Sequence, residues 1–398
     1  MDRVPLGGLV AEVISDDLTK TYCPLPFKAV FVESMGVSPC CYVVRQPVSI
    51  NQWSDNPRLK GLQTMLLQGD TPPPCRICMQ AEKDYGHSLR MEAMRDYDNK
   101  IFTELDIDNI DYRASNICNF KCRSCGPAFS HGINQEVLKN PELKQYYVIS
   151  NENKTVSIGP ENQTWIEDNI QRIRRFMFTG GEPTFIPEVK NMLAKILTTG
   201  HTQAQILITS NCSWTDDFWK ELTEKCSNLH WTASIDATED DAGIIRWGSD
   251  WQRISANLQW LAENAQSLDI NTVISNLNVL RLKPLLSYVR NLQYKSRTPT
   301  GKHGDQGCRH QFHVCDGGDH LDATNWPPDM KPMVLNYLRD CLNLDLDQEQ
   351  QSTIVSLITR IEAKSFNKDQ WDQTKHFNTT LDLIRGQDHT QLLEPRYQ

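Results

Sequence analysis

The sequence has neither a long apolar run nor an excess of basic residues, and each absence excludes a class of protein. No stretch reaches the length of about 18 apolar residues that a membrane-spanning helix needs. The formal net charge is −9, which makes nucleic acid a poor default partner. Residues 1–20 lack the apolar region of a signal peptide, so we expect a protein of the cytoplasm.

Cysteine is the residue type that the sequence has in excess. The chain holds 13 cysteines, and in a reducing compartment clustered cysteines indicate metal ligands or catalytic groups rather than disulfides. Three of them stand alone and are expected to be buried small hydrophobic residues: Cys212, Cys226 and Cys341. The others are grouped, so metal chemistry is the first function to consider.

Short apolar runs alternate with amphipathic segments from about residue 104 onward. Strands are expected at residues 105–115, 174–183, 204–211, 229–237, 269–276 and 311–315. Helices are expected at 215–226, with an N-cap at Thr215, and at 251–266. Strands and helices that alternate with short links predict an α/β fold with a parallel sheet, closed as a partial (β/α)6 TIM-type barrel.

Three regions are expected along the chain. Residues 1–98 are rich in cysteine and in helix breakers, which predicts a small, loop-rich metal-binding domain. Within it, residues 81–98 predict one amphipathic connecting helix. Residues 99–320 hold the barrel strands, and residues 321–398 predict a mostly helical extension whose last part, about 30 residues, is weakly patterned.

The motif "CNFKCRSC" contains Cys118, Cys122 and Cys125 in the spacing C-x3-C-x2-C. A tetrahedral zinc site or an ordinary iron–sulfur cluster takes four ligands. Three thiolates can hold three corners of a cubane cluster and leave one iron without a protein ligand. The alternative is a zinc site whose fourth ligand lies elsewhere in the sequence.

"CNFKCRSC" at one strand end, followed by "GGEP" at the next, resembles the radical S-adenosylmethionine (SAM) superfamily. The resemblance implies that Cys118, Cys122 and Cys125 bind a [4Fe–4S] cluster whose unique iron is chelated by SAM. Reductive cleavage of SAM would then give a 5′-deoxyadenosyl radical that abstracts hydrogen from a substrate. By the same resemblance, Phe120 lies near the adenine.

The "GGEP" segment matches the part of the family that meets the SAM amino group. It comprises Gly180, Gly181, Glu182 and Pro183. Glycines let a backbone approach a ligand closely, and a carboxylate suits an ammonium. The alternative for an isolated "GGEP" is a turn at the end of a strand.

Polar residues at later strand ends match the family with less specificity. The resemblance implies contacts to SAM for Ser210, Asn211, Ser234, Asp236 and Asn276, with Ser234 and Asp236 at the strand end used for the ribose hydroxyls. Turn chemistry at the ends of strands is the alternative for these positions. Arg246 is a weaker candidate for a SAM contact, and a solvated surface arginine is the alternative.

A second cysteine pattern lies at the front of the chain. Cys23, Gly36 and Cys41 follow C-x12-G-x4-C, and Cys75 and Cys78 form a later C-x2-C. The pattern resembles the twitch or SPASM domains of radical SAM enzymes and implies one auxiliary [4Fe–4S] cluster. Those domains usually follow the barrel, and here the pattern precedes it. Cys40 is an alternative to Cys41, and a zinc-ribbon-like site is the alternative to the cluster.

Residues 303–320 are rich in histidine and cysteine. They contain His303, Cys308, His310, His313, Cys315 and His320. A polar loop near the barrel mouth is the favoured interpretation, and a third metal site is the alternative.

The motifs together predict a radical SAM oxidoreductase or maturase with peptide or protein modification favoured. Expected partners are SAM, an unidentified substrate and an electron donor such as a flavodoxin or ferredoxin. The alternatives are a dehydrogenase of small alcohols, an activase that installs a glycyl radical, and a zinc-binding interaction protein without turnover. The sequence does not identify the substrate.

Overall fold

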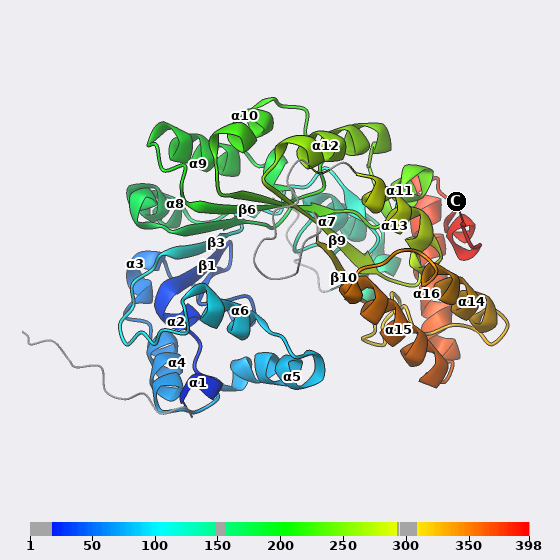
Figure 1. Cartoon of the computed structure of the whole chain (residues 1–398), viewed down its shortest axis with the longest axis horizontal. Helices are drawn as coiled ribbons and strands as arrows, with labels where there is room; N and C mark the ends of the chain where they lie inside the picture. Colours follow the sequence, from blue (N-terminus) through cyan, green and yellow to red (C-terminus); the bar gives the residue numbers. More distant parts are fainter. Residues whose placement is uncertain (1–17, 148–155, 293, 295–308, 398) are drawn as a thin grey trace, which may run out of the picture. The chain divides into compact units, whose positions relative to one another are not determined.

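The computed structural model describes residues 18–147, 156–292, 294 and 309–397, which form two compact units (Figure 1). The first unit comprises residues up to Asp111 together with Ile158–Arg174, and the second comprises Tyr112–Ser157 and Arg175–Gln398. Each unit has buried hydrophobic clusters of its own. The predicted division into three domains at residues 98 and 320 stays a prediction.

The first unit is mainly helical and contains one antiparallel hairpin. Its strands are β1 (Ala29–Glu33) and β2 (Gly36–Ser38), and β3 (Asn109–Tyr112) runs to its boundary. Its helices are α1 (Leu18–Thr21), α2 (Leu25–Lys28), α3 (Ile50–Trp53), α4 (Pro57–Leu67), α5 (Arg76–Tyr85), α6 (Leu89–Asp96) and α8 (Pro160–Asp168), with 3-10 turns η1 (Pro73–Cys75) and η3 (Ile170–Arg172).

Two sequence predictions for this unit were wrong. The region is not loop-rich, because residues expected to interrupt helices instead begin them. At the start of α4, the Asn56 side chain accepts from Arg58 N (2.9 Å), and Pro57 occupies the first helical position. The predicted single helix at 81–98 is two helices. Gly86 ends α5 with φ 71°, and Ser88 begins α6 by accepting from Met91 N at 3.1 Å.

The second unit contains a parallel sheet, as the sequence predicted. Neighbouring strands follow the order β10-β9-β7-β6-β5, and every pair is parallel. The strands are β5 (Arg175–Phe178), β6 (Gln205–Ser210), β7 (Leu229–Ser234), β9 (Ser267–Ile274) and β10 (His310–Val314). Buried residues alternate along β6, β7 and β9, which places one face of each strand in the core.

Helices connect these strands and extend the unit toward its C-terminus. They are α7 (His131–Lys139), α9 (Pro187–Thr198), α10 (Phe218–Lys225), α11 (Glu239–Ile245), α12 (Trp251–Asn264), α13 (Leu282–Asn291), α14 (Lys331–Cys341), α15 (Gln348–Ala363) and α16 (Lys368–Arg385). The 3-10 turns are η2 (Pro141–Tyr146), η4 (Pro183–Phe185), η5 (Val279–Arg281) and η6 (His389–Leu393). Helix α10 begins after Asp217 rather than at Thr215, because Asp216 Oδ1 accepts from Phe218 N at 2.9 Å.

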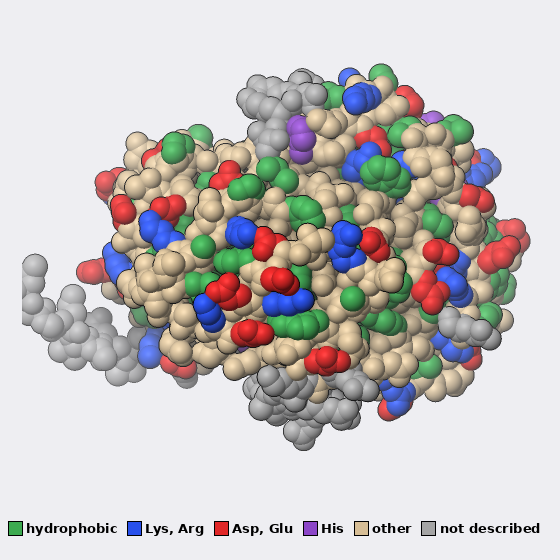
Figure 2. Space-filling model, turned by 90° about the horizontal axis from the view of Figure 1, so that it is seen from above, with side chains coloured by type: hydrophobic (Ala, Val, Ile, Leu, Met, Phe, Trp, Pro, Cys, Tyr) green, Lys and Arg blue, Asp and Glu red, His purple; other side chains and the backbone are tan. Residues whose placement is uncertain are grey.

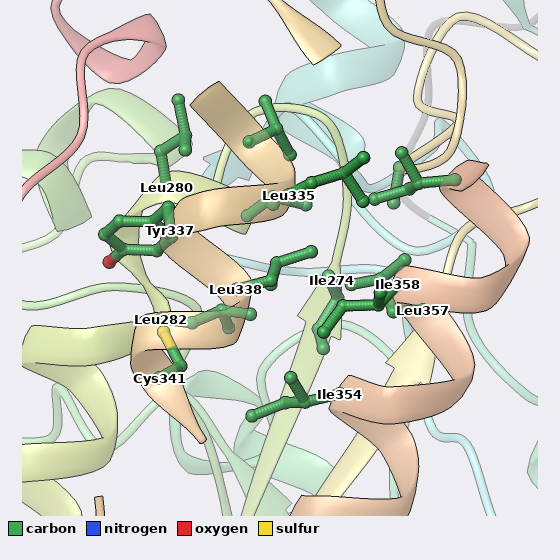
Figure 3. Close-up of a cluster of buried hydrophobic side chains, with 14 of the residues drawn as sticks. Ile274, Leu280, Leu282, Leu335, Tyr337, Leu338, Cys341, Ile354, Leu357 and Ile358 are labelled. Carbon is green, nitrogen blue, oxygen red and sulfur yellow. The ribbon is translucent and has the colours of Figure 1, made fainter. Parts of the chain in front are cut away.

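The C-terminal helices share a hydrophobic core with the end of the sheet. Figure 3 shows Leu338 of α14 and Leu357 of α15 beside Ile274 of β9. Trp371 of α16 belongs to the same cluster. The segment after α15, which the sequence left weakly patterned, is the 18-residue helix α16.

The surface carries both signs of charge. On the face shown in Figure 2, acidic and basic side chains are interspersed. In the part of the chain that the structure describes, no helix combines the length and the apolar character needed to cross a membrane.

The buried His310 predicts that stability falls in acid. Burial lowers its pKa to about 3, and its Nε2 lies 2.8 Å from Thr272 Oγ1. In the unfolded chain His310 therefore binds a proton near pH 6.5, whereas in the folded chain it binds one only near pH 3. As the pH falls through this window, the free energy of unfolding should decrease by up to about 1.4 kcal/mol per pH unit from this group.

Urea unfolding between pH 7 and pH 5 measures this effect. The slope of stability against pH should be smaller in His310→Gln than in the wild type, and unchanged in the control His87→Gln, which alters an exposed histidine. Equal slopes in all three proteins would show that His310 is not the responsible group.

Candidate active site

The three cysteines of the triplet lie on a loop that a short strand pair fixes. Within the loop, β4 (Lys121–Cys122) pairs antiparallel with β8 (Arg246–Trp247), so Cys122 lies opposite Arg246. The Arg123 N–H donates to Ile245 O at 2.8 Å, and the Cys125 N–H donates to Cys122 O at 3.2 Å. Backbone hydrogen bonds therefore determine the turn between the last two cysteines.

The thiols of the triplet are free and half-buried. Burial, together with the neighbouring Cys122 thiol, raises the pKa of Cys125 to about 12. Burial likewise raises the pKa of Cys118, with smaller effects from Cys122 and Cys125. The three thiols therefore affect one another's ionisation. The donor set is suited to a metal centre that replaces the thiol protons.

The sulfurs are spaced more widely than a single zinc ion needs. Among the cysteines that the structure describes, no three sulfurs all lie within 4.8 Å of one another. Tetrahedral Zn–S bonds of about 2.3 Å would place the sulfurs about 3.8 Å apart. A cubane cluster is larger than one metal ion and separates its thiolates further. The spacing of the triplet is therefore compatible with a cubane cluster.

The glycine turn of "GGEP" is packed against the backbone that leads into Cys118. A Cβ on residue 181 would lie 2.0 Å from Ile117 O, so only glycine fits at Gly181. Gly180 has φ +90°, a conformation that also favours glycine. The Glu182 N–H donates to Ile117 O at 2.7 Å. The two motifs therefore form one structural unit.

Glu182 is a buried carboxylate with a set of protein donors. Oε1 accepts from Ser210 Oγ (2.7 Å) and from Thr184 Oγ1 (2.7 Å), and Oε2 accepts from Asn211 N (2.6 Å). Burial raises the pKa of Glu182, and these hydrogen bonds oppose the rise. The predicted residues Ser210 and Asn211 therefore hold the carboxylate in place.

A ring of polar side chains links β6 to the cysteine loop. Asn211 Nδ2 donates to Asn119 Oδ1 at 2.9 Å, and Asn119 Nδ2 donates to Ser213 Oγ at 2.8 Å. Ser213 Oγ closes the ring by donating to Asn211 Oδ1 at 2.6 Å. Asn119 stands between the first two cysteines, so the end of β6 fixes the loop there. Phe120, the next residue, is buried, and a Cβ at Gly248 would lie 3.5 Å from its ring.

Asp236 and Arg246 form a buried ion pair beside the cysteines. Asp236 Oδ2 accepts from Arg246 Nε at 2.8 Å, and Oδ1 accepts from Val273 N at 2.9 Å. Both oxygens of Asp236 thus have protein donors, and its partner Arg246 pairs with Cys122 in the register of β4 and β8. Arg246 is 13% exposed at its side chain, so it is not the solvated surface residue of the alternative interpretation.

The other two predicted SAM contacts lie in different surroundings. Ser234 is half-buried at the end of β7. Asn276 is buried, and its Nδ2 donates to His320 O (2.9 Å) and to Thr374 Oγ1 of α16 (3.3 Å). Asn276 therefore also ties the end of β9 to the C-terminal helices.

The first unit brings four cysteines together. Cys75 ends η1 and Cys78 lies one helical turn later in α5, while Cys23 and Cys40 come from the segments on either side of the hairpin. Burial raises the pKa of Cys23, and the thiols of Cys40, Cys75 and Cys78 raise it further. Cys40 also packs against the hydrophobic cluster that contains Cys23.

The charged surroundings of these four cysteines are paired. Glu82 Oε2 accepts from Arg90 Nη2 at 2.6 Å, and Ser88 Oγ donates to Glu82 Oε1 at 2.6 Å. Arg90 Nη1 donates to Tyr22 O at 3.0 Å, next to Cys23 in the sequence. The ion pair connects α5 to α6 and to the segment before Cys23, so it holds the cysteine-bearing segments together.

The described part of the histidine-rich stretch has separate structural contacts. His310 bonds to Thr272, His320 packs on Phe377 with ring centroids 4.2 Å apart, and His313 is exposed. Cys315 packs against a hydrophobic cluster of the second unit. His303 and Cys308 lie outside the described residues.

Sequence reasoning missed two charged residues around the triplet. Arg123 and Glu136 are buried and make ion pairs with the helix α16. An arginine between two cysteines was visible in the motif, but its partner lies more than two hundred residues later and has no sequence signal. Glu136 looks like an ordinary helix surface residue in the sequence.

Comparisons with known proteins find distant structural neighbours. No family profile and no curated protein sequence matches the chain. SuiB of Streptococcus suis, bound to the precursor peptide SuiA, is similar at 13% identity and a TM-score of 0.38, over 70% of this chain and 51% of SuiB. The structure of anSMEcpe with bound AdoMet is similar at 16% identity and a TM-score of 0.37, over 58% of this chain and 58% of anSMEcpe. TYW1 with a lysine–pyruvate adduct is similar at 15% identity and a TM-score of 0.26, over 43% of this chain and 57% of TYW1.

These neighbours are radical SAM enzymes, the superfamily that the two motifs resemble. In these comparisons the chain spans less than two thirds of the length of SuiB and of anSMEcpe.

The tight fit at Gly181 predicts a strong effect of adding a methyl group there. Gly181→Ala should lower the free energy of unfolding by about 2–3 kcal/mol, because its Cβ would overlap the Ile117 carbonyl. Gly243→Ala is the matched control: it lies in helix α11 with nothing within 4 Å of its Cβ, and should raise stability by about 0.5–1 kcal/mol. Urea unfolding measures both. Equal stability of the two variants would contradict the described contact.

Proposed function

We propose that this chain is a radical SAM enzyme that modifies a peptide or a protein. The observation that carries the proposal is the junction at Ile117. There the loop with three free thiols is bonded to the glycine turn that carries the buried Glu182. An open coordination position distinguishes reactive metal sites from structural ones, and three thiolates leave such a position on a cubane cluster.

In this proposal each residue of the site has a defined role. Cys118, Cys122 and Cys125 bind the [4Fe–4S] cluster. With the cluster and SAM bound, one electron from the proposed donor would cleave SAM to methionine and a 5′-deoxyadenosyl radical, which would remove a hydrogen atom from the substrate. Glu182 accepts from the SAM ammonium through the remaining lone pairs of its carboxylate.

The neighbouring residues shape the SAM site. Gly180, Gly181 and Pro183 form the turn that permits the close approach, and Ser210 and Asn211 hold Glu182. Phe120 lies on the adenine side. Ser234 and Asp236 serve the ribose, with Asp236 also positioning Arg246, and Asn276 lines the far side. We further propose that the parallel sheet curves into a partial (β/α)6 barrel around this site.

A zinc protein without turnover is less well supported. The wide spacing of the sulfurs opposes a single zinc ion at either cysteine set. The buried Glu182 at the strand end has no purpose in a zinc-stabilised interaction module, because burying a carboxylate costs stability.

The first unit is proposed to hold an auxiliary [4Fe–4S] cluster through Cys23, Cys75, Cys78 and a fourth thiolate. The glycine spacing favoured Cys41 as the fourth. The packing supports Cys40, because Cys40 packs against the hydrophobic cluster that contains Cys23. We therefore propose Cys40 as the ligand.

The substrate and the electron donor are proposed only as chemical classes. SuiB and anSMEcpe have been solved with peptides bound, and a peptide or protein substrate is proposed here by analogy. A flavodoxin or ferredoxin is the proposed electron donor. No disulfide joins the described cysteines, and the cytoplasm is the proposed compartment.

Replacing the triplet tests the main proposal. Anaerobically reconstituted wild-type protein should form 5′-deoxyadenosine from SAM on reduction. Cys118→Ala, Cys122→Ala and Cys125→Ala should each abolish this product, since two thiolates do not retain the cluster. Cys226→Ala, which alters a buried cysteine remote from the motif, should retain it. A wild type with stoichiometric zinc and no 5′-deoxyadenosine would refute the proposal.

The second set of cysteines should behave differently. The wild type should bind about eight irons per chain, from two cubane clusters. Cys75→Ala with Cys78→Ala should lose about four of them and keep SAM cleavage while losing substrate conversion. Cys40→Ala should show the same loss of iron, and Cys41→Ala should not. The reverse result for the last two variants would make Cys41 the ligand.

A further inference from the structure

Arg123 is fully buried inside the cysteine loop, with 0% of its surface exposed. A guanidinium has five N–H donors, and the protein provides five acceptors here. Nε donates to Ile244 O (3.0 Å) and Nη1 donates to both oxygens of Asn378 (3.0 and 3.2 Å). Nη2 donates to Asp382 Oδ1 and to Gln387 Oε1 (3.1 Å). No donor is left for SAM or a substrate, so Arg123 is not a ligand-binding group.

Most of these acceptors come from the C-terminal segment. Asn378 and Asp382 lie one turn apart on α16, and Gln387 follows its end. The second oxygen of Asp382 accepts from His389 N (2.9 Å) and lies 2.6 Å from His389 Nδ1. The carboxylate therefore joins Arg123 of the loop to the turn after α16.

A second ion pair joins the same helix to the other side of Cys122. Arg385, in the last turn of α16, donates to Glu136 Oε2 at 2.6 Å and to Oε1 at 3.2 Å. Lys121 Nζ donates to Glu136 Oε1 at 2.9 Å. The side chains of Arg385 and Glu136 are 1% and 4% exposed. Helix α16 is thus tied to the residue before Cys122 and to the residue after it.

We propose that α16 is part of the cluster site and that Asp382, through Arg123, is a positioning residue that holds Cys122 and Cys125 in the geometry that binds the cluster. The inference rests on the proposed function, since it assumes a cluster on the triplet. Its physical basis is the cost of an unpaired buried charge. Without the Asp382 carboxylate, Arg123 loses its anion in a site closed to water, and the loop must move to solvate it. Groups that orient metal ligands typically change metal affinity about 10- to 100-fold.

The test uses the reconstituted holoprotein and the EPR signal of its reduced cluster. SAM alters only the signal of a cluster with an open iron, so the SAM-responsive part reports the triplet and excludes the auxiliary cluster. In Asp382→Asn, a chelator should remove the SAM-responsive signal about tenfold faster or more than in the wild type. Glu136→Gln should act in the same direction. The rest of the iron should leave at the wild-type rate in both variants.

Asp372→Asn is the matched control on the same helix. Its carboxylate pairs with Lys368 and Lys375 at the surface, and an exposed ion pair contributes little. It should lose the SAM-responsive signal within about twofold of the wild-type rate. If Asp382→Asn does not fold, Gln387→Ala, which removes one acceptor from Arg123, takes its place with the same expected direction.

The outcomes separate this inference from the proposed function. A wild type without a SAM-responsive signal would overturn the proposed function. A wild type with that signal, together with variants that lose it no faster than Asp372→Asn, would overturn only the positioning role. Equal acceleration of both iron pools would also overturn it, because a general loss of stability does not select the triplet.

Discussion

The close approach of Gly181 to the Ile117 carbonyl is the contact on which the candidate site depends. It leaves no room for a side chain at residue 181, and it sets the start of the cysteine loop directly against the turn that carries Glu182. Because Glu182 is also bonded to the end of β6 through Ser210 and Asn211, hydrogen bonds join two strand ends and the loop. The backbone that carries Cys118 is thereby held in place next to the glycine turn.

The charged side chains around the triplet are balanced. Four basic and four acidic side chains are buried or half-buried beside the loop: Lys121, Arg123, Arg246 and Arg385, with Glu136, Glu182, Asp236 and Asp382. Each cation has an anion partner, so their burial does not leave isolated charges. Burial raises the pKa of Cys122, and the Arg246 guanidinium opposes the rise. In the first unit the Glu82 carboxylate and the Arg90 guanidinium likewise form an ion pair.

The parallel strands could be predicted from the sequence because their apolar alternation is uninterrupted. The segment predicted at 204–211 is strand Gln205–Ser210, and that at 229–237 is Leu229–Ser234. The sequence did not predict the bounds of helix α16, because its buried face is partly polar. That face carries Gln370, Thr374 and Asn378 beside Trp371, Phe377 and Leu381. A helix whose inner face binds polar groups shows a weak apolar period. The break at Gly86 was missed because its positive φ cannot be inferred from composition alone.

In the candidate site, too, local motifs could be predicted from the sequence and long-range contacts could not. The cysteine loop, the glycine turn and the residues at the end of β6 are local motifs, and the structure brings them together. Asp236 was predicted as a ribose contact, and the structure adds that it pairs with Arg246. The ion pairs of Arg123 and Glu136 with α16 join segments about 250 residues apart, and only the folded chain reveals them.

The central claim is that one iron of a cluster on Cys118, Cys122 and Cys125 is left open for SAM. The most direct test is electron–nuclear double resonance on the reduced holoprotein with SAM labelled by ¹⁵N at its amino group and ¹⁷O at its carboxylate. If SAM chelates the open iron, both labels should show hyperfine coupling to the cluster, and both couplings should be lost in Cys122→Ala. A reduced cluster that shows no coupling to either label would contradict it.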